Sequence, residues 1–432
     1  MRLILSLLFL GFNISMFAQN FNAQQVDAYL EYLNKENRFM GSVALLQNNK
    51  VIYTKAVGYQ NLSLQKNATP KSTYHIGSIS KTFTATLILK AIEEGKLTLQ
   101  TPLSQYYAQI PNAEKITIGH LLNHSSGIFN FTDAADYQKI YYKAQSKTTL
   151  LDFIQKLGTS FEPGTQHGYS NANYLLLSYI LEDIYAQSYA MILEQKITNP
   201  LKLKSTYLGN KKDKQKTNSY LFMNKWIISP KTHYSVPLGA GAIVSTPKDL
   251  VLFGTALLQG KILKPETLAL MLDFKEAYGL GIFQLSPEAV GHTGGIDGYQ
   301  SILVIYEKGD KALAIISNGM NYNIESIVLA LESALEGNTI ALPDFSKVEL
   351  SKEALQAYVG VYHSEEFPLD ITITEVDGIL YGQATGQGAF PLEATSKTVF
   401  VFNAAGIKLT FDLQAKTMLL QQAGQEFLFE KA

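Results

Sequence analysis

The order of strand-like and helix-like segments constrains the fold of this chain more than any other feature. Strand-like runs occur near both ends of the first 335 residues, and the stretch between them is rich in helix signals. Such an order predicts an α/β (α+β) fold in which one antiparallel sheet is built from both ends, with helices on its faces and a helical insertion. The expected strands are 42–47, 51–57, 279–284, 300–306 and 312–317.

Helices are expected where apolar side chains recur every three to four residues. Gly95 ends one of them, Asn173 is the expected N-cap of another, and Thr246 with Pro247 starts a third. The expected helices span residues 23–35, 80–94, 118–123, 174–185, 246–258, 264–272 and 324–335.

The sequence changes character near Gly337–Pro343. Beyond this point strand-like runs occur at 370–375, 399–402, 408–413, 418–421 and 426–429, and Asp377-Gly378 is a strong hairpin turn. We therefore predict a first domain over residues 20–338 and a small C-terminal all-β domain, a barrel or a sandwich, over residues 345–432.

The N-terminus has the pattern of a signal peptide. Arg2 precedes the apolar run Leu3–Leu10, a softer apolar stretch follows to Phe17, and Ala18-Gln19 leads into polar sequence. The run is short for a membrane span, which needs about 20 apolar residues. Residues 1–19 thus predict export to the periplasm or the medium, with no membrane span after cleavage. An uncleaved anchor is the alternative interpretation.

Composition removes several classes of function. The formal net charge is -1, whereas nucleic-acid binders usually carry a basic excess, so no nucleic-acid partner is expected. The chain has no cysteine, which excludes disulfides, thiolate metal sites and cysteine nucleophiles. His120 and His124 have metal-ligand spacing but no acidic partner at the expected place, so no metal and no other cofactor is predicted.

Without cysteine, covalent catalysis needs an activated hydroxyl or a carboxylate. A serine three residues before a lysine on a helix places the amine beside the hydroxyl, and burial lets a neutral amine accept the proton. Of the three such pairs, only the one that follows Gly77 begins an apolar-faced helix, whose N-terminus would also stabilise an oxyanion. The pairs are Ser63/Lys66, Ser78/Lys81 and Ser245/Lys248.

Two further motifs follow in the chain. Tyr169-Ser170-Asn171 lies on a Pro/Gly-rich loop that enters a helix. His292-Thr293-Gly294-Gly295 comes just before an expected strand, and its glycines would expose the backbone to a substrate.

Together, Ser78-x-x-Lys81, Tyr169-x-Asn171 and His292-Thr-Gly294 resemble the ordered motifs of the serine β-lactamase and penicillin-binding protein superfamily. The resemblance extends over about residues 22–336 and implies a β-lactamase/transpeptidase-like fold. Its class C-like branch includes class C β-lactamases, D-Ala-D-Ala carboxypeptidases, D-aminopeptidases and esterases. Segments similar to that branch are 121–127, 164–174, 239–246 and 278–281.

The resemblance implies a role for each motif residue. Ser78 would be acylated, Lys81 would help to remove its proton, and Tyr169 would act as base or proton relay at the leaving group. The backbone N–H groups of Ser78 and Gly295 would form the oxyanion hole.

Substrate binding would fall to Asn171, which would hold the substrate amide, and to the strand residues Thr293, Gly294 and Gly295. His292 would support Tyr169 or bind a substrate carboxylate. It departs from the family pattern, because many members have lysine there, and the charge of a histidine depends on pH. The departure argues against an efficient β-lactamase.

The sequence thus predicts a serine hydrolase that forms an acyl-enzyme, with D-amino-acid, peptidoglycan-type peptides as the leading substrates. A carboxylesterase and a weak β-lactamase remain alternatives within the enzymes, and a penicillin- or peptide-binding protein without turnover is a third class. The expected partner is therefore a small peptide, ester or β-lactam, and the oligomeric state is left open. We expect the C-terminal domain to shape the cleft or to bind a polymer.

Overall fold

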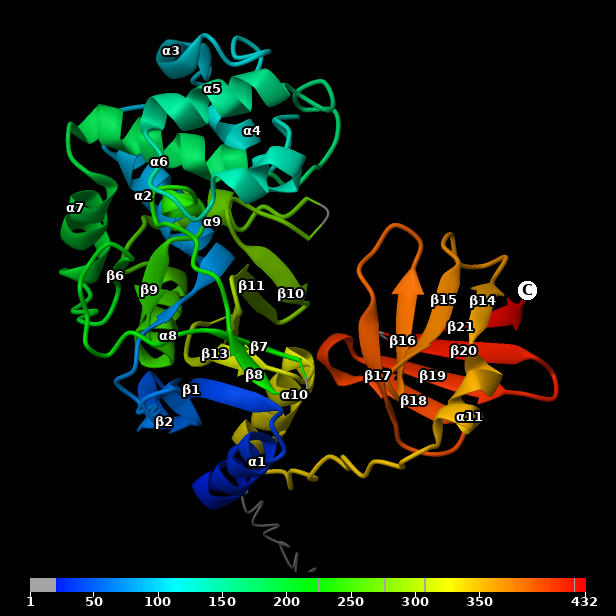
Figure 1. Cartoon of the computed structure of the whole chain (residues 1–432). Coiled ribbons are helices and arrows are strands. Elements are labelled where there is room, and N and C mark those ends of the chain that lie inside the picture. The colour runs from blue at the N-terminus through cyan, green and yellow to red at the C-terminus, as the bar shows by residue number, and fades with distance from the viewer. Residues whose placement is uncertain (1–20, 224, 276, 307, 423) are drawn as a thin grey trace, which may run out of the picture.

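The computed structural model describes residues 21–432 except 224, 276, 307 and 423. The signal peptide predicted for residues 1–19 lies outside the described residues. The chain forms a mixed helix-and-sheet part and, beside it, a β-barrel, joined by an extended linker (Figure 1).

The central sheet combines strands from both ends of the first part, as predicted. β1 and β13 pair antiparallel through nine registered positions, and the main path runs β10-β11-β12-β13-β1-β2. The strands are β1 Phe39–Gln47, β2 Lys50–Val57, β10 Phe283–Ser286, β11 Ala289–Ile296, β12 Tyr299–Tyr306 and β13 Lys311–Met320, with the hairpin of β7 Tyr220–Phe222 and β8 Trp226–Ile228 attached at β13.

Each face of this sheet is covered by helices. Along β1, Val43 and Leu45 pack into one core with α1 (Ala23–Lys35) and α10 (Ile324–Leu335). Ala44 and Leu46 point to the opposite core, because successive side chains of a strand alternate between faces. That second core contains α2 Ser80–Glu93 and α8 Pro247–Leu258, whose Phe83 and Phe253 rings stack 3.7 Å apart.

The helical insertion lies above the sheet in Figure 1. Its helices are α3 Ser104–Tyr107, α4 Ile118–Leu122, α5 Lys147–Leu157, α6 Asn171–Tyr185, α7 Tyr189–Leu193 and α9 Pro265–Met271. Short strands pair beside it, β3 Tyr59–Asn61 with β4 Lys66–Asn67, and β9 Ile243–Ser245 with both β5 Tyr74–His75 and β6 Tyr207–Leu208.

Several boundaries predicted from the sequence are wrong. The first strand begins at Phe39 rather than at residue 42, β13 runs to Met320 rather than to residue 317, and the motif 292–295, expected just before a strand, lies within β11. Helix α6 begins at Asn171 rather than at residue 174, because Asn130 Oδ1 from another loop accepts the Asn171 N–H. Asn173 is therefore not its N-cap. Strand β10 begins at Phe283 rather than at residue 279, because Gly279 closes a turn with Ile282.

The C-terminal part is a closed antiparallel barrel, which decides between the two all-β shapes that the sequence left open. Its strands follow chain order: β14 Gly360–His363, β15 Ile371–Val376, β16 Ile379–Ala384, β17 Phe390–Ala394, β18 Val399–Phe402, β19 Ile407–Asp412, β20 Thr417–Gln422 and β21 Gln425–Lys431. The short helix α11 Lys352–Leu355 precedes them. Buried residues such as Phe400, Phe411 and Phe429 form the core of the barrel, as expected for eight strands.

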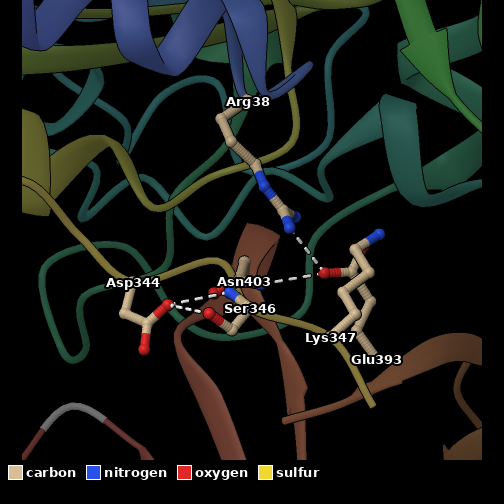
Figure 2. Close-up of polar contacts among 6 residues, drawn as sticks. All are labelled: Arg38, Asp344, Ser346, Lys347, Glu393 and Asn403. Carbon is tan, nitrogen blue, oxygen red and sulfur yellow. Dashed lines mark hydrogen bonds and ion pairs between the residues drawn. The ribbon is translucent and has the colours of Figure 1, made fainter. Parts of the chain in front are cut away.

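A buried ion pair connects the two parts (Figure 2). Arg38, the only arginine in residues 21–432, is 2% exposed and donates from Nη2 to Glu393 Oε2 of the barrel at 2.7 Å. Its guanidinium lies over the ring of the linker residue Phe345, 4.4 Å from the centroid. Lys347 and Asn403 also donate to the Glu393 carboxylate. The barrel is therefore attached to the start of β1 by a specific charged contact as well as by the chain.

Candidate active site

Ser78 lies in a short 3-10 turn, Gly77–Ile79, directly before α2. Gly77 has φ +50, and a Cβ there would lie 2.7 Å from the backbone N of Gly295. A Cβ on Gly294 would lie 2.1 Å from the carbonyl oxygen of Ile76. Only glycine at these two positions lets strand β11 approach the turn that carries Ser78 so closely.

The structure brings three predicted residues together at the Ser78 hydroxyl. Lys81 Nζ lies 3.0 Å from Ser78 Oγ, and the Tyr169 hydroxyl donates to the same oxygen at 2.9 Å. The two other Ser-x-x-Lys pairs are not arranged in this way. Lys66 Nζ donates to the carbonyl of Lys214, and the Ser245 hydroxyl bonds to that of Thr206.

Lys81 is fully buried, and within the described residues no carboxylate lies within ion-pair distance of it. Burial lowers the pKa of Lys81 well below its usual range, because no opposite charge repays the loss of solvation. Its Nζ lies 2.8 Å from both Asn171 Oδ1 and the Ala240 carbonyl. A neutral amine donates its two hydrogens to these oxygens and offers its lone pair to the Ser78 hydroxyl.

Tyr169 is held as a neutral phenol. Burial raises the pKa of Tyr169 far above its usual value, and the hydrogen bond with Ser78 only partly offsets this. Its ring lies 4.9 Å from Lys81 Nζ and so forms an apolar wall of the lysine pocket. As a phenol, Tyr169 can donate a proton to a group bound at Ser78.

His292 lies inside the site but carries no charge at neutral pH. It is 1% exposed, and burial, with Lys81 as a lesser cause, lowers the pKa of His292 to about 3. Its Nδ1 donates to the Thr293 carbonyl at 2.6 Å, so its Nε2 carries a lone pair, 3.4 Å from the Tyr278 hydroxyl. His292 therefore gains the positive charge expected at this position only far below physiological pH.

The end of strand β11 offers a free backbone edge beside Ser78. Strand β10 pairs only with Ala289, Val290 and Gly291 in the register of the described residues, so residues 292–296 have a neighbour, β12, on one side alone. A Cβ on Gly295 would meet nothing within 4 Å. The space beside Gly295 is therefore open, and the exposed Thr293 lies two residues before it.

Asn171 is oriented by residues that the sequence did not single out. Its Nδ2 donates to Asn130 Oδ1 at 3.2 Å and to Thr132 Oγ1 at 3.1 Å. These bonds direct its Oδ1 toward Lys81. Both ends of the Asn171 amide, which was expected to hold the substrate, are therefore already hydrogen-bonded within the protein. Both partners come from a loop about 40 residues earlier, and no local sequence signal connects that loop to position 171.

His124 contacts the loop that carries Tyr169, at a position considered from the sequence only for metal binding. Its Nδ1 accepts the Ser170 N–H at 3.2 Å and lies 3.2 Å from Asn173 Nδ2. Its ring lies 4.3 Å from the ring of Tyr169. His124 therefore holds the loop that carries Tyr169.

The comparisons with known proteins agree with the class of protein that the Ser78 site indicates, a serine hydrolase. Residues 26–334 match the family model described as Beta-lactamase. Penicillin-binding protein 4* of Bacillus subtilis (strain 168) is 27% identical over an alignment of 441 positions, which covers 93% of this chain and 97% of that protein.

Two further relatives cover the first part of the chain. A teichoic acid D-alanine hydrolase of Staphylococcus aureus (strain MRSA252) is 27% identical over 70% of this chain and 75% of its own length. The crystal structure of the D-amino acid amidase from Ochrobactrum anthropi SV3, complexed with L-phenylalanine amide, has a TM-score of 0.61 and 25% identity over 68% of this chain and 90% of that chain.

The chain belongs to the β-lactamase family and is a serine hydrolase. Across residues 21–432, apart from the four left out, no helix combines the length and the apolar character that crossing a bilayer requires.

Proposed function

We propose that this protein hydrolyses D-aminoacyl amides, esters or short peptides through an acyl-enzyme on Ser78. The observation that carries the proposal is the pair of contacts at Ser78 Oγ, one from the Tyr169 phenol and one from the buried, unpaired Lys81. A neutral lysine beside a serine hydroxyl is a general base for nucleophilic attack.

In the first step the Ser78 hydroxyl passes its proton to Lys81 Nζ while Oγ forms a bond to the substrate carbonyl carbon. The N–H groups of Ser78 and Gly295 stabilise the resulting oxyanion. Tyr169 donates its proton to the leaving amine or alcohol as the bond to it breaks, and recovers a proton from the Lys81 ammonium. Water then attacks the ester and gives a proton to the regenerated Ser78 hydroxyl.

The electrostatics of the site favour amides and esters over substrates that end in a free carboxylate. His292 is neutral, Lys81 has a lowered pKa, and Tyr169 stays protonated. Thr293 and the backbone of β11 can still bind a neutral leaving group. The relatives named for D-alanine hydrolysis and for D-amino acid amidase activity support the same acyl group.

A panel of substrates tests the proposal. D-alanine p-nitroanilide, a D-alanyl ester, a D-Ala-D-Ala peptide and p-nitrophenyl butyrate are assayed with wild type and Ser78→Ala, together with the L-enantiomers. We expect wild type to prefer the D-alanyl compounds and Ser78→Ala to lose all turnover. Faster cleavage of the butyrate ester than of every D-alanyl compound would favour the carboxylesterase instead.

We also propose that the protein is exported after loss of residues 1–19 and that residues 20–338 and 345–432 are its two domains. The leader pattern supports export. The separate barrel core, and the extended linker that follows α10, with Phe345 stacked on Tyr32 of α1, support the division. Mass spectrometry of the mature protein and limited proteolysis of residues 338–350 test these two statements.

A further inference from the structure

Strand β11 runs on past Gly295 to a carboxylate at its end. Asp297 occupies the turn between β11 and β12 with φ +55 and is followed by Gly298. Asp-Gly is a favoured hairpin turn, but Asn-Gly serves such a turn equally well. The turn therefore explains the backbone at this position and leaves the negative charge unexplained.

The Asp297 side chain is directed at the loop that borders the cleft. Its Oδ1 accepts from the Thr232 hydroxyl at 2.7 Å and from the Thr232 N–H at 3.1 Å. Burial raises the pKa of Asp297, and the hydrogen bonds from Thr232 and the charges of Lys231 and Lys216 only partly offset it. The carboxylate is thus desolvated, which makes it a strong site for a cation that can reach it.

Neither nearby lysine pairs with this carboxylate. Lys231 Nζ donates to Asn218 Oδ1, and Lys216 Nζ donates to the Gly209 carbonyl. In the described part of the chain no cation lies within ion-pair distance of Asp297. Together with Gly295 and Ile296, Asp297 lines an open cavity of about 640 Å³, so a ligand has access to this end of the strand.

The direction of the strand decides which half of a substrate faces Asp297. His292 lies beside Tyr278, and the rings of Tyr278 and Tyr169 both lie next to His124. A strand rises about 3.3 Å per residue, so Asp297 lies roughly 16 Å further on from His292 and about 7 Å beyond Gly295. With its carbonyl oxygen at the Gly295 N–H, a substrate directs its leaving group to Tyr169. Its acyl group then extends along β11 toward Asp297.

We propose that Asp297 binds the free α-ammonium group of a D-aminoacyl substrate and thereby selects such substrates over N-acylated ones. The inference rests on the proposed function, because it concerns the acyl half of the same substrate. An ammonium between the Gly295 carbonyl and this carboxylate makes a charge-assisted hydrogen bond. The amide N–H of an N-acylated substrate carries no charge, so it cannot form an ion pair with Asp297.

The test compares D-alanine p-nitroanilide with its N-acetyl derivative in wild type and Asp297→Asn. Asparagine keeps the turn and an acceptor for Thr232 but removes the charge. We expect kcat/KM for the free amine to fall about tenfold to a hundredfold, mainly through KM, the size of a lost charged hydrogen bond. The N-acetyl compound should change less than about threefold, and Asp297→Glu should retain part of the preference for the free amine.

Asp213→Asn is the matched control, because Asp213 is also a partly buried carboxylate that accepts from Tyr207 and Thr73 hydroxyls. It should leave the ratio between the two substrates unchanged. Equal losses on both substrates in Asp297→Asn would show that Asp297 only anchors Thr232 and would overturn the inference, as would no change on either. Failure of the proposed function looks different: wild type would cleave neither nitroanilide, or Ser78→Ala would cleave both.

Discussion

Among the described residues, Lys81 and Arg38 are buried basic side chains with opposite surroundings. Lys81 in the site is fully buried, and among the described residues no carboxylate pairs with it. Arg38 at the junction is 2% exposed and is paired with Glu393 of the barrel at 2.7 Å. A lysine can lose its proton when burial makes the charge costly, whereas an arginine remains charged and requires a partner. Lys81 can therefore act as a base, whereas Arg38 attaches the barrel to the first part of the molecule.

The largest loss of activity is expected when Lys81 of the site is replaced by arginine, the residue that stands at the junction with the barrel. Lys81→Arg places a group that cannot be deprotonated beside Ser78, so no general base remains. We expect kcat/KM on a D-alanyl substrate to fall by about 10²–10⁴-fold, as measured by initial rates. Lys66→Arg is the control, because Lys66 belongs to another Ser-x-x-Lys pair but is exposed. Retained activity in Lys81→Arg would rule out Lys81 as the base.

The next change removes the contact between Arg38 and Glu393 that joins the barrel to the first part of the molecule. Arg38→Met leaves the Glu393 carboxylate without its main partner. Removing one member of a fully buried pair costs about 3–5 kcal/mol, and the cost here is smaller because Glu393 is 23% exposed and keeps Lys347. We expect the barrel to unfold or detach at lower urea concentration, monitored by limited proteolysis of the linker. Lys115→Met, which breaks an exposed pair with Glu162, should cause no measurable shift.

The double variant Arg38→Met/Glu393→Leu sharpens this result. Removing both charges leaves no buried charge unpaired, because Lys347, which also contacts Glu393, is exposed, so stability should return close to that of wild type. A double variant that is as unstable as the Arg38→Met variant would show that the pair itself, and not the avoided buried charge, holds the barrel, and one as unstable as the sum of the two single variants would show that the two residues act independently.

A smaller effect is expected from a buried histidine of the site, His292. The pKa of His292 is lowered to about 3 in the folded protein, whereas in the unfolded chain it is about 6.5. Its stabilising contribution is therefore complete above pH 6.5 and is lost as the pH falls toward 3, by up to about 1.4 kcal/mol per pH unit.

His292→Gln should make the fall in Tm between pH 7 and pH 4 shallower, as followed by thermal unfolding. The exposed His363→Gln should leave that slope unchanged. Identical slopes in wild type and His292→Gln would contradict a neutral, buried His292.

The motifs of the site could be predicted from sequence because their chemistry is local. Ser78 and Lys81 are one helical turn apart, and the glycines of β11 indicate a close approach of two backbone segments. What brings the distant motifs into register is not local. The bonds from Asn130 to Asn171 and from His124 to Ser170 join loops about 40 residues apart, and no periodicity encodes them.

The same distinction holds for the fold. Strand alternation and turn signals predicted the central sheet and an all-β C-terminal part. Closure of the barrel depends on the pairing of β14 with β21, whose partners Tyr362 and Lys431 lie at opposite ends of that part of the sequence. The contact between the two parts could not be predicted from the sequence either, because Arg38 and Glu393 come together only after both parts have folded.

The central claim is that an unpaired, buried and neutral Lys81 activates Ser78. The most direct measurement is the rate at which a fluorophosphonate labels the protein as a function of pH, with the modified peptide identified by mass spectrometry. The account predicts one adduct, on Ser78, which forms rapidly at pH 7, slows as the pH falls and Lys81 gains a proton, and is nearly abolished at every pH in Lys81→Arg. An adduct on another residue, or equal labelling rates in wild type and Lys81→Arg, would contradict it.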